Sequence, residues 1–456
     1  MRTLVLGSAI TAASVVRHVV AQGGDVVVVE DRPDTIADWS QRAARLIELG
    51  ASVVAAPQIA EALVLVDSTD RIVPSPGVPE RHPVIAAARA RGIPVSSEIE
   101  LAAALAAGDP DAPVLVAITG TNGKTTVTTL TAAILEASGV TAAAAGNIGR
   151  PLLDAITDDV QVVVAEVSSF QLAFTEQFRP RVGALLNLGE DHLDWHRTFD
   201  AYAQAKRNVF AHQGPEDVVI FNADDPLVAG LVADAPGRRI PFSIAPGAAV
   251  GARVVETATG RLLVGPDDSE LVALDDLPRA RPVDLANALA AAAVAREVGA
   301  TTEGVASALR EFRGIAHRMT LVAERHGVQW IDDSKATNVH ATLAAADGLP
   351  SVVLMAGGLN KGVDLSALRV LAPRLRAVIA IGDAAPEIVE AFASTEVPVV
   401  TAASMTDAVR SASAHARSGD TVLLSPGCAS FDWYSSYAER GDDFARRVRT
   451  LVEVDR

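Results

Sequence analysis

Short apolar runs alternate with segments of helical periodicity along most of the chain. In residues 1–111 the strand-like runs are 4–6, 26–29, 63–66 and 71–73. Strands that alternate with helices in this way are typical of a parallel α/β sheet. The pattern therefore predicts a first α/β domain over residues 1–111, which ends in a segment rich in Ala, Gly, Asp and Pro at 106–113.

The rest of the chain continues this alternation. Strand-like runs at 160–165, 182–187 and 217–221 precede a turn-rich, β-like stretch at 238–274 and helical patterns at 285–298 and 302–312. The turn Arg313-Gly314-Ile315 predicts a second boundary. We therefore expect a central domain over 112–316 and a C-terminal α/β domain over 317–456, with strand-like runs at 330–332, 352–356, 377–381 and 421–424.

Composition narrows the class of protein. The 456 residues carry a net charge of −17, which argues against a general binder of nucleic acid or anionic membranes. The single Cys428 excludes an intrachain disulfide and a multi-cysteine metal site, which fits a reducing cytoplasm. Arg17 and His18 interrupt the apolar N-terminus, and no apolar run is long enough to span a membrane. We expect a cytoplasmic monomer that acts on small molecules.

The most informative motif is a predicted phosphate loop. It reads Gly120-Thr121-Asn122-Gly123-Lys124-Thr125-Thr126 and lies between a strand-like run and a helix-like segment through Ala137. Backbone N–H groups and the helix dipole favour an anion there, Lys124 supplies a point charge, and a Thr hydroxyl is able to bind Mg²⁺. Ile118 replaces the first glycine of the usual motif, so the match is to the shorter G-x-x-G-K-T core. The loop predicts an ATP site.

Two further strand ends carry candidate ligands for a metal ion. Glu166 ends a strand-like run, at the position that holds the Mg²⁺-binding acid in P-loop sheets, although an acid that merely begins a loop is the alternative. His192 follows the next run within an acidic loop and is a metal ligand, a general base or a structural residue. We expect both side chains to lie near Lys124.

Lys206 lies on the helix-like segment that follows. A free ammonium beside Mg²⁺ is electrostatically unfavourable. The residue pattern alone therefore favours a phosphate contact or an exposed lysine.

Polar residues also gather after strands of the first and third domains. The first turn lacks G-x-G-x-x-G, Glu30-Asp31 either meets a ribose or is structural, and Ser75-Pro76-Gly77 is a rigid turn where ligands of such sheets bind. In the third domain, loop 332–338 combines acids, a hydroxyl, a cation and an amide, which favours a functional site. Lys361 follows a glycine pair and is able to orient a carboxylate. Cys428 has no base partner in the sequence, so we do not expect a nucleophile.

Taken together, these motifs resemble the Mur ligase family over essentially the whole chain. The loop 119–126 is shared by its superfamily, including folylpolyglutamate synthases, whereas 146–149, 166–172, 333–338 and 425–430 are similar to the member that adds D-glutamate. The resemblance implies a Rossmann-like N-terminal domain for a UDP-linked substrate, a central P-loop ATPase-like domain with a mostly parallel sheet, and a Rossmann-like C-terminal domain for the amino acid. It implies an ATP- and Mg²⁺-dependent amide ligase that adds D-glutamate to UDP-N-acetylmuramoyl-L-alanine through an acyl phosphate, in peptidoglycan precursor synthesis.

The resemblance also assigns roles to individual residues. Those expected to act in catalysis are Lys124, Lys206 and His192. Those expected to bind ATP are Gly120, Thr121, Asn122, Gly123, Lys124, Thr125, Thr126, Asn287, Arg318 and Asp333. Those expected to hold magnesium are Thr125, Glu166, His192 and Lys206, the last as a carbamate, whose negative charge removes the conflict with the metal. Those expected to contact the UDP-linked substrate are Ser8, Thr11, Arg32, Ser75, Pro76, Gly77 and Asn147, the last of which would contact either this substrate or ATP. Those expected to receive D-glutamate are Lys335, Thr337, Lys361, Ser430 and Tyr437.

The chain departs from the family pattern in places. Asp284 stands where the family often shows the first of two asparagines, so that only Asn287 remains, and the first domain matches loosely. Another Mur ligase or a folylpolyglutamate synthase-like ligase is the alternative function. A regulatory nucleotide switch is a rival of another class: Asn360-Lys361 begins like a guanine-reading N-K-x-D motif, but Asp364 falls one residue too late.

Overall fold

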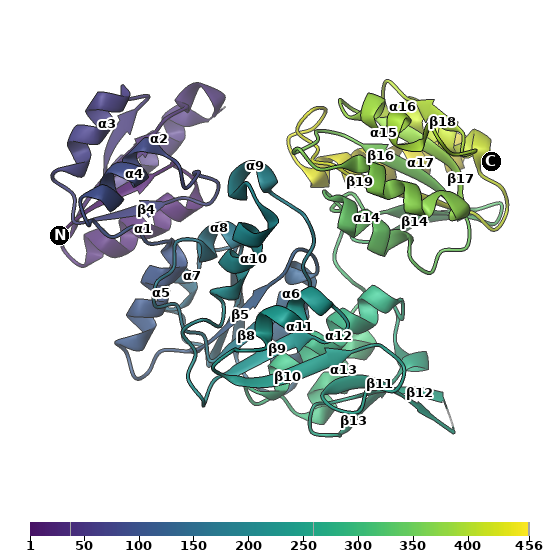
Figure 1. Ribbon diagram of the computed structural model, residues 1–456, viewed down its shortest axis with the longest axis horizontal. Coiled ribbons are helices and arrows are strands. Elements are labelled where there is room, and N and C mark those ends of the chain that lie inside the picture. Colours follow the sequence, from purple (N-terminus) through teal and green to yellow (C-terminus); the bar gives the residue numbers. More distant parts are fainter. Residues whose placement is uncertain (37, 259, 455–456) are drawn as a thin grey trace. The chain divides into compact units, whose positions relative to one another are not determined.

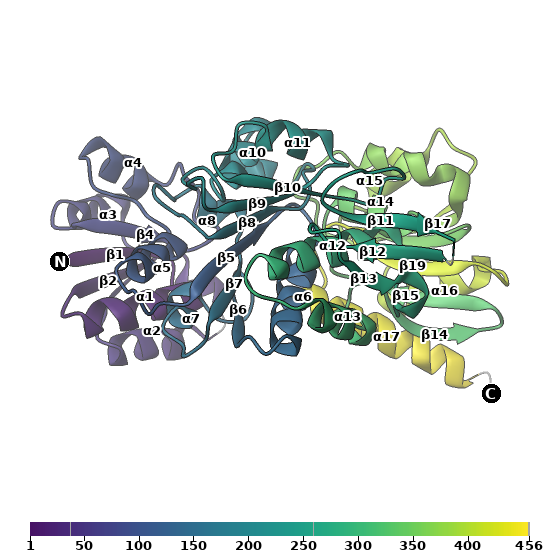
Figure 2. The ribbon, with the colours of Figure 1, turned by 90° about the horizontal axis from the view of Figure 1, so that it is seen from below.

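The computed structural model describes residues 1–36, 38–258 and 260–454 and contains three β-sheets (Figures 1 and 2). The chain forms two compact units. The first holds Met1–Leu188, Asp200–Leu277 and Asn287–Glu311, and the second holds Gly189–Phe199, Pro278–Ala286 and Phe312–Arg456. The predicted α/β fold class is confirmed, while the domain boundaries at 111 and 316 remain predictions.

The first sheet is parallel, with strand order β3-β2-β1-β4. Its strands are β1 (Arg2–Leu6), β2 (Asp25–Glu30), β3 (Ser52–Ala55) and β4 (Arg71–Pro74). The helices around it are α1 (Ile10–Ala21), η1 (Pro33–Thr35), α2 (Trp39–Glu48), α3 (Ile59–Val66), α4 (Pro83–Ala90) and α5 (Glu98–Ala107). Val26, Val27, Val28 and Val29 are all buried, because a parallel sheet is covered on both faces.

One strand prediction in this region is wrong. The apolar run 63–66 forms the end of α3, and the strand lies earlier, at β3. A four-residue apolar run does not distinguish a strand from a buried helix turn. The helix begins where the Glu61 carboxylate accepts the backbone N–H of Gln58, 3.0 Å away.

The second sheet has nine strands in the order β13-β12-β11-β10-β9-β8-β5-β7-β6. Only the β11-β12 and β12-β13 pairs are antiparallel. Its strands are β5 (Val114–Thr119), β6 (Ala142–Gly146), β7 (Val162–Glu166), β8 (Val182–Leu185), β9 (Val218–Asn222), β10 (Arg238–Ser243), β11 (Ala252–Thr257), β12 (Gly260–Val264) and β13 (Glu270–Ala273). The helices along this segment are α6 (Lys124–Ala137), α7 (Leu152–Ala155), α8 (Ser169–Leu172), α9 (Leu193–His196), α10 (Phe199–Arg207), α11 (Pro226–Val232), η2 (Leu274–Asp276), α12 (Pro282–Arg296) and α13 (Thr302–Glu311).

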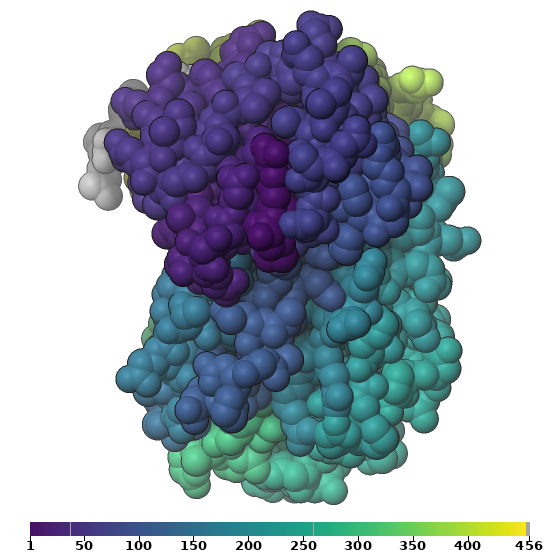
Figure 3. Space-filling model, turned by 90° about the vertical axis from the view of Figure 1, so that its left-hand side faces the viewer, coloured from purple at the N-terminus to yellow at the C-terminus, as the bar shows by residue number. Residues whose placement is uncertain are grey.

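The first and second sheets belong to the same compact unit, and Figure 3 shows a face on which residues of the first (purple) adjoin residues of the second (blue to teal). Asp154 of α7 contacts two side chains of α1. Its carboxylate accepts hydrogen bonds from Ser14 Oγ at 2.8 Å and Arg17 Nη2 at 2.6 Å. These contacts join the two sheets through short, charge-assisted bonds.

The third sheet lies in the second unit, in the order β14-β15-β19-β16-β17-β18, and only its edge strand β14 is antiparallel. Its strands are β14 (Thr320–Arg325), β15 (Val328–Asp332), β16 (Val352–Gly357), β17 (Leu375–Ile381), β18 (Val399–Thr401) and β19 (Thr421–Gly427). Its helices are α14 (Val339–Ala346), η3 (Leu365–Arg374), α15 (Ala385–Phe392), α16 (Met405–His415) and α17 (Tyr437–Val454). Alternate residues of β16 enter two cores: Val352 and Leu354 pack with α14 and α15, and Val353 and Met355 with α16 and α17.

Each sheet has a point where the strand order reverses. β1 lies between β2 and β4, β5 between β7 and β8, and β19 between β15 and β16. In open α/β sheets, ligands bind beyond the carboxyl ends of the strands at such a point. Most of the residues for which the sequence predicts a binding role lie in the loops that follow these central strands and the strands on either side of them.

Candidate active site

The phosphate loop leaves β5 at the reversal of the nine-stranded sheet. Gly120 has φ +157° and Gly123 has φ +83°, and a Cβ on Gly123 would lie 2.6 Å from Asn287 Oδ1. Only glycine fits at Gly123, because a side chain would be strained by the backbone and would collide with this amide. Asn187, after β8, exchanges two hydrogen bonds with Asn122: Asn187 Oδ1 accepts the Asn122 N–H at 2.8 Å, and Asn187 Nδ2 donates to the Asn122 carbonyl at 3.1 Å.

The Lys124 side chain curls back over its own loop. Its Nζ donates to the carbonyl oxygens of Gly120 at 2.9 Å and Thr121 at 2.8 Å. Both acceptors are neutral dipoles, and Lys124 is half-buried at the first turn of α6. An anion at this helix N-terminus would therefore meet a nearby ammonium and the helix dipole together.

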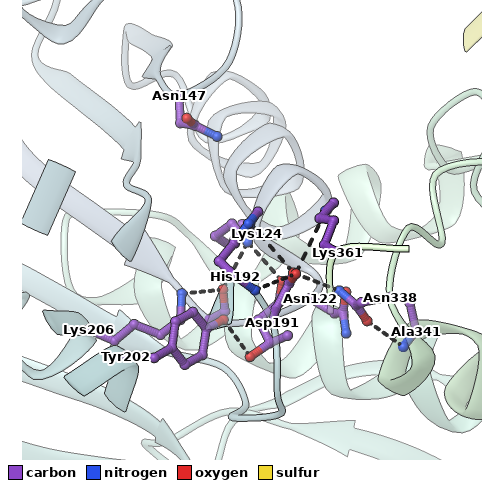
Figure 4. A network of polar contacts seen from close by, with 12 residues as sticks. Asn122, Lys124, Asn147, Asp191, His192, Tyr202, Lys206, Asn338, Ala341 and Lys361 are labelled. Carbon is purple, nitrogen blue, oxygen red and sulfur yellow. Dashed lines mark hydrogen bonds and ion pairs between the residues drawn. The ribbon is translucent and has the colours of Figure 1, made fainter. Parts of the chain in front are cut away.

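Lys206 is almost fully buried, with an exposed fraction of 1%. The sequence-based alternative of an exposed lysine is therefore wrong, because α10 packs this side chain against the end of β5. Lys206 Nζ donates to the Gly120 carbonyl at 2.8 Å, and lies 4.7 Å from the ring centre of Tyr202, one turn earlier on α10 (Figure 4). The ammonium thus shares one carbonyl oxygen with Lys124, beside a ring whose quadrupole attracts cations.

Glu166 is the last residue of β7, next to β5, and is 3% exposed. Its Oε1 accepts a hydrogen bond from Asn147 Nδ2 at 2.9 Å, whereas its Oε2 is buried and has no hydrogen-bond partner among the residues that the structure describes. A buried carboxylate oxygen without a partner is costly unless something binds it. A hard cation is the ligand that such an oxygen suits best.

The residues present fit a nucleotide-borne Mg²⁺. Such an ion keeps several waters and phosphate oxygens and takes only one or two carboxylates from the protein. Among the residues that the structure describes, no group of three or more His, Cys, Asp and Glu side chains is arranged to hold a metal ion. A site of this composition would therefore depend on the nucleotide, with Glu166 as its carboxylate.

Several residues predicted to bind the UDP-linked substrate follow strands of the first sheet: Ser8 follows β1, Arg32 follows β2, and Ser75 follows β4. Ser8 donates from both its N–H and its hydroxyl to Glu30 Oε2, at 3.0 and 2.7 Å, and Arg32 N–H donates to Glu30 Oε1 at 3.2 Å. Glu30 thus ties the loops after β1 and β2 together. Ser75 Oγ is buried without a hydrogen-bond partner, so it has a donor for a ligand.

A cavity of about 1220 Å³ adjoins these loops. Ser8 is the predicted substrate residue in its lining, which also includes Arg17, Arg42, Arg45 and Arg150. Thr11 is 8% exposed, within the first turns of α1, whereas Arg32 and Gly77 are exposed.

In the second unit, Asp333 follows β15 directly and is buried. Its Oδ1 accepts the Met319 N–H at 3.1 Å and its Oδ2 accepts the Ser425 hydroxyl at 2.8 Å. Burial raises the pKa of Asp333 to about 7, although these hydrogen bonds and the charge of Arg318 act in the opposite direction. Asp333 is therefore a carboxyl group that titrates near neutral pH.

The loop with His192 contacts residues that follow β15 and β16. Asn338 Nδ2 donates to Asp191 Oδ2 at 3.0 Å, and Lys361 Nζ lies 3.8 Å from Asp191 Oδ1 (Figure 4). Asn338 also caps α14, because its Oδ1 accepts the Ala341 N–H at 2.8 Å. His192 has φ +55°, so its backbone is in the left-handed region. The structure places His192 with the second unit, whereas Lys124, Glu166 and Lys206 lie in the first.

The loops after β15, β16 and β19 contain the residues predicted to receive D-glutamate. Lys335 Nζ lies 4.8 Å from the ring centre of Tyr437, which begins α17. Ser430 is 2% exposed, after β19, and Thr337 and Lys361 are half-buried. The three loops thus bring cations and hydroxyl groups to the carboxyl edge of one sheet.

Cys428 lies in the same region but is buried, and burial raises the pKa of its thiol to about 12. A thiol of this kind stays protonated at neutral pH and is a poor nucleophile. The structure therefore agrees with the sequence in giving Cys428 no role as a nucleophile.

Sequence reasoning missed several residues that shape these loops. Asn187 and Tyr202 hold the phosphate loop, where the Tyr202 hydroxyl lies 2.8 Å from Thr121 Oγ1. Arg279 and Arg281 form ion pairs with Asp284, at 3.1 and 2.8 Å. Asp284 stands where the family often has an asparagine, and these two arginines balance its charge. Tyr202 was detectable as the residue four before Lys206, on the same helix face. The arginine pairs had no such signal.

Three family descriptions match consecutive parts of this chain: "Mur ligase MurD-like, N-terminal domain" over residues 1–97, "Mur ligase middle domain" over 118–295, and "Mur ligase, glutamate ligase domain" over 317–428. The phosphate loop, the three strand-order reversals and these matches define one class of protein. The chain belongs to the Mur ligase family.

Two curated relatives that are similar to this chain carry the same name. The UDP-N-acetylmuramoylalanine--D-glutamate ligase of Frankia casuarinae is 42% identical over 98% of this chain and 93% of its own length. The enzyme of the same name from Thermobifida fusca is 39% identical over 99% of this chain and 98% of its own. Among solved structures, MurF from Acinetobacter baumannii matches with TM-score 0.62 and 19% identity, covering 97% of this chain and 93% of its own. MurF from Thermotoga maritima, solved in complex with ADP, matches with TM-score 0.62 and 17% identity, covering 94% and 96%. These structures support the fold.

Among the described residues, no helix has both the length and the apolar character needed to cross a membrane.

Proposed function

We propose that this protein is an ATP-dependent amide ligase that joins D-glutamate to UDP-N-acetylmuramoyl-L-alanine in the synthesis of peptidoglycan precursors. The observation that carries the proposal is identity of about 40% over nearly the whole chain to relatives of that name. A phosphate loop at the strand-order reversal of the nine-stranded sheet supports the use of ATP. The small-molecule substrates follow from the same relatives.

The first step makes the substrate carboxyl group reactive. The carboxylate oxygen attacks the γ-phosphorus of ATP, the bond to the bridging oxygen breaks, and ADP leaves behind an acyl phosphate. Negative charge is spread over the transferring group, and Lys124 would offset it by exchanging its two loop carbonyls for phosphoryl oxygens. Exchange of neutral acceptors for anionic ones favours this movement.

The second step forms the amide bond. The D-glutamate nitrogen attacks the acyl carbon, loses a proton, and phosphate leaves from the tetrahedral intermediate. D-Glutamate carries two carboxylates, for which Lys335, Thr337, Lys361, Ser430 and Tyr437 would supply cations and hydroxyl groups. Support for this assignment comes from their common place at the carboxyl edge of the third sheet.

Magnesium would be held by Thr125, Glu166, His192 and a carbamylated Lys206, and when bound it supplies positive charge to the phosphates. The unpartnered Glu166 Oε2 supports this set. Carbamylation of Lys206 would convert its buried ammonium to an anion. Arg318, Asp333 and Asn287 would complete the ATP site, and Ser8, Thr11, Arg32, residues 75–77 and Asn147 the UDP-substrate site. The predictions of a cytoplasmic location and a monomer stay predictions.

A coupled assay of ADP release tests the function. We expect ADP only when UDP-N-acetylmuramoyl-L-alanine and D-glutamate are both present, and none with L-glutamate, L-alanine or diaminopimelate in place of D-glutamate. A preference for one of these amino acids would instead indicate a sibling ligase. Release of no phosphate with any combination would reject ligase chemistry.

A further inference from the structure

Arg440 is a buried cation that no part of the proposed mechanism uses. It lies one turn into α17 and is 1% exposed, the largest of the fully buried side chains in the described chain. Long charged side chains are rarely buried in this way unless they are paired. The reason for its burial therefore lies in its contacts.

The guanidinium group of Arg440 joins two separate loops by five hydrogen bonds. Toward the loop after β15, its Nε donates to Ser334 Oγ at 2.9 Å and its Nη2 to the Ser334 carbonyl at 2.8 Å. Toward the loop after β19, its Nη1 donates to the carbonyls of Cys428 at 3.2 Å and Ala429 at 3.1 Å, and its Nη2 to Cys428 at 3.2 Å. A planar fork with five N–H donors satisfies this arrangement, and a lysine has neither the shape nor the number.

A third loop is packed against the same group. A Cβ on Gly358, after β16, would lie 3.1 Å from Arg440 Nη1 and 2.3 Å from the Ala429 carbonyl oxygen. The φ of Gly358 is +127°, so both the backbone and the space require glycine. Arg440 therefore lies at the meeting point of the three loops at the reversal of the third sheet.

The partners of Arg440 are direct neighbours of the residues assigned to D-glutamate. Ser334 precedes Lys335 and also donates its hydroxyl to the Tyr437 carbonyl at 2.8 Å. Ala429 precedes Ser430, which is buried. A shift of Arg440 would thus displace Lys335, Tyr437 and Ser430 together, and a misplacement of about 1 Å can cost on the order of 100-fold in rate.

Within the described part of the chain, no carboxylate forms a hydrogen bond or ion pair with the guanidinium group of Arg440. Its five hydrogen bonds all go to carbonyl or hydroxyl oxygens. Burial lowers the pKa of the guanidinium to about 10, although the negative charges of Asp432 and Asp332 act to raise it. The group therefore keeps its positive charge at neutral pH. A buried positive charge that its own contacts do not neutralise attracts an incoming dicarboxylate.

We propose that Arg440 is the positioning residue of the D-glutamate site: it fixes the spacing of the loops after β15 and β19 and adds positive charge beneath them. The proposal rests on the proposed function, because it takes the amino acid to bind at these loops. Arg440 itself does not touch the reacting atoms, and it acts through Lys335, Ser430 and Tyr437.

Two substitutions of Arg440 distinguish the role of its planar set of N–H donors from the role of its positive charge. Arg440→Lys keeps a cation but loses the planar donors, and Arg440→Ala opens a space that guanidinium ion is able to fill. Arg376→Lys is a matched control in the same sheet: Arg376 holds Asp420 by two hydrogen bonds, and this pair joins the amino ends of β17 and β19. Steady-state kinetics and thermal unfolding are measured for wild type and all three variants.

We expect Arg440→Lys to raise the KM for D-glutamate by about 10- to 100-fold while the KM for ATP changes less than about 2-fold. Arg376→Lys should lower the unfolding temperature without changing either KM. Millimolar guanidinium should lower the KM for D-glutamate of Arg440→Ala but not of wild type. If Arg440→Ala does not fold, Arg440→Lys decides.

An unchanged KM for D-glutamate in a folded Arg440→Lys would overturn the proposal, as would an equal rise of the KM for D-glutamate and for ATP. Failure of the proposed function looks different. In that case wild type itself would release no ADP in response to D-glutamate, whatever the state of Arg440.

Discussion

The carboxyl edges of the nine-stranded and six-stranded sheets bind their proposed ligands in opposite ways. At the first, seven consecutive residues, Gly120 to Thr126, supply the backbone donors, the lysine and the hydroxyl groups. At the second, the groups come from three loops that start after β15, β16 and β19, which end at Asp332, Gly357 and Gly427. A phosphate needs only a turn and a helix start, whereas a dicarboxylic amino acid needs groups on several sides.

The cations at the two edges, Lys124 and Arg440, also differ in whether their contacts are local or distant along the chain. Lys124 is half-buried, and its Nζ donates to two neutral carbonyls of its own loop. Arg440 is buried and holds two loops that are distant in sequence. In the roles proposed for them, Lys124 would act on the transferring phosphoryl group directly, whereas Arg440 would fix the shape of the amino-acid site.

The strongest test of the first edge is Lys124→Ala. We expect a loss of at least about 10³-fold in kcat/KM, because an electrostatic stabiliser of the transferring phosphoryl group is removed. The circular dichroism spectrum should match that of wild type, since Lys124 Nζ donates to two carbonyls of its own loop and the side chain is only half-buried. A folded variant with a near-normal rate would disprove the assignment of this loop to ATP.

Lys206→Ala tests whether an anion is needed beside the phosphate loop. We expect a loss of about 10²-fold in kcat and partial recovery with short carboxylic acids such as acetate, which would replace the carbamate. Lys124→Ala serves as the control, because acids should not rescue a missing cation. Absence of rescue at Lys206 would leave it as a simple cation that holds the Gly120 carbonyl.

The smallest expected effect concerns Asp333 at the second edge. Its pKa is raised from 3.8 to about 7. At a pH between these two values, the carboxyl group is protonated in the folded state and ionised in the unfolded chain. The sign of the linkage follows: its contribution to stability is present at low pH and is lost as the pH rises through 7. Between pH 5 and pH 8 this amounts to roughly 3 kcal/mol.

Asp333→Asn should remove this part of the pH dependence, because an amide does not ionise. Urea unfolding of wild type and variant at both pH values measures the difference. Equal pH dependence of the two proteins would show that Asp333 is already ionised in the folded state.

Much of the fold was predictable from local pattern. The alternation of apolar runs with helical segments predicted most strands of the three sheets, and it failed at 63–66, where a short apolar run belongs to α3. The edge strands β6, β14 and β18 were also missed, because they are only partly buried. Periodicity reports burial, so it is weakest where an element is half exposed.

The residues of the candidate site likewise fall into two groups: those that a local sequence pattern predicts, and those that it does not. Residues of the phosphate loop, Glu166 and the loop around Asp333 were found because several polar groups lie together directly after a strand. The Lys206 side chain showed no such signal for its burial, and Arg440 lies within an amphipathic helix among other charged residues. Nothing in the local sequence distinguishes an arginine that makes five hydrogen bonds to carbonyl and hydroxyl oxygens from one that faces water.

The sequence by itself determined the α/β class, the place of the phosphate loop and the resemblance to the Mur ligases, because these depend on residues that are neighbours along the chain. Tertiary structure alone decided that Lys206 and Lys124 share the carbonyl of Gly120, that a buried oxygen of Glu166 has no hydrogen-bond partner among the described residues, and that Arg440 joins the loops after β15 and β19. The physical reason is that strand order brings together segments from different parts of the chain. Strand order is set by the packing of whole sheets and is not written in any one segment.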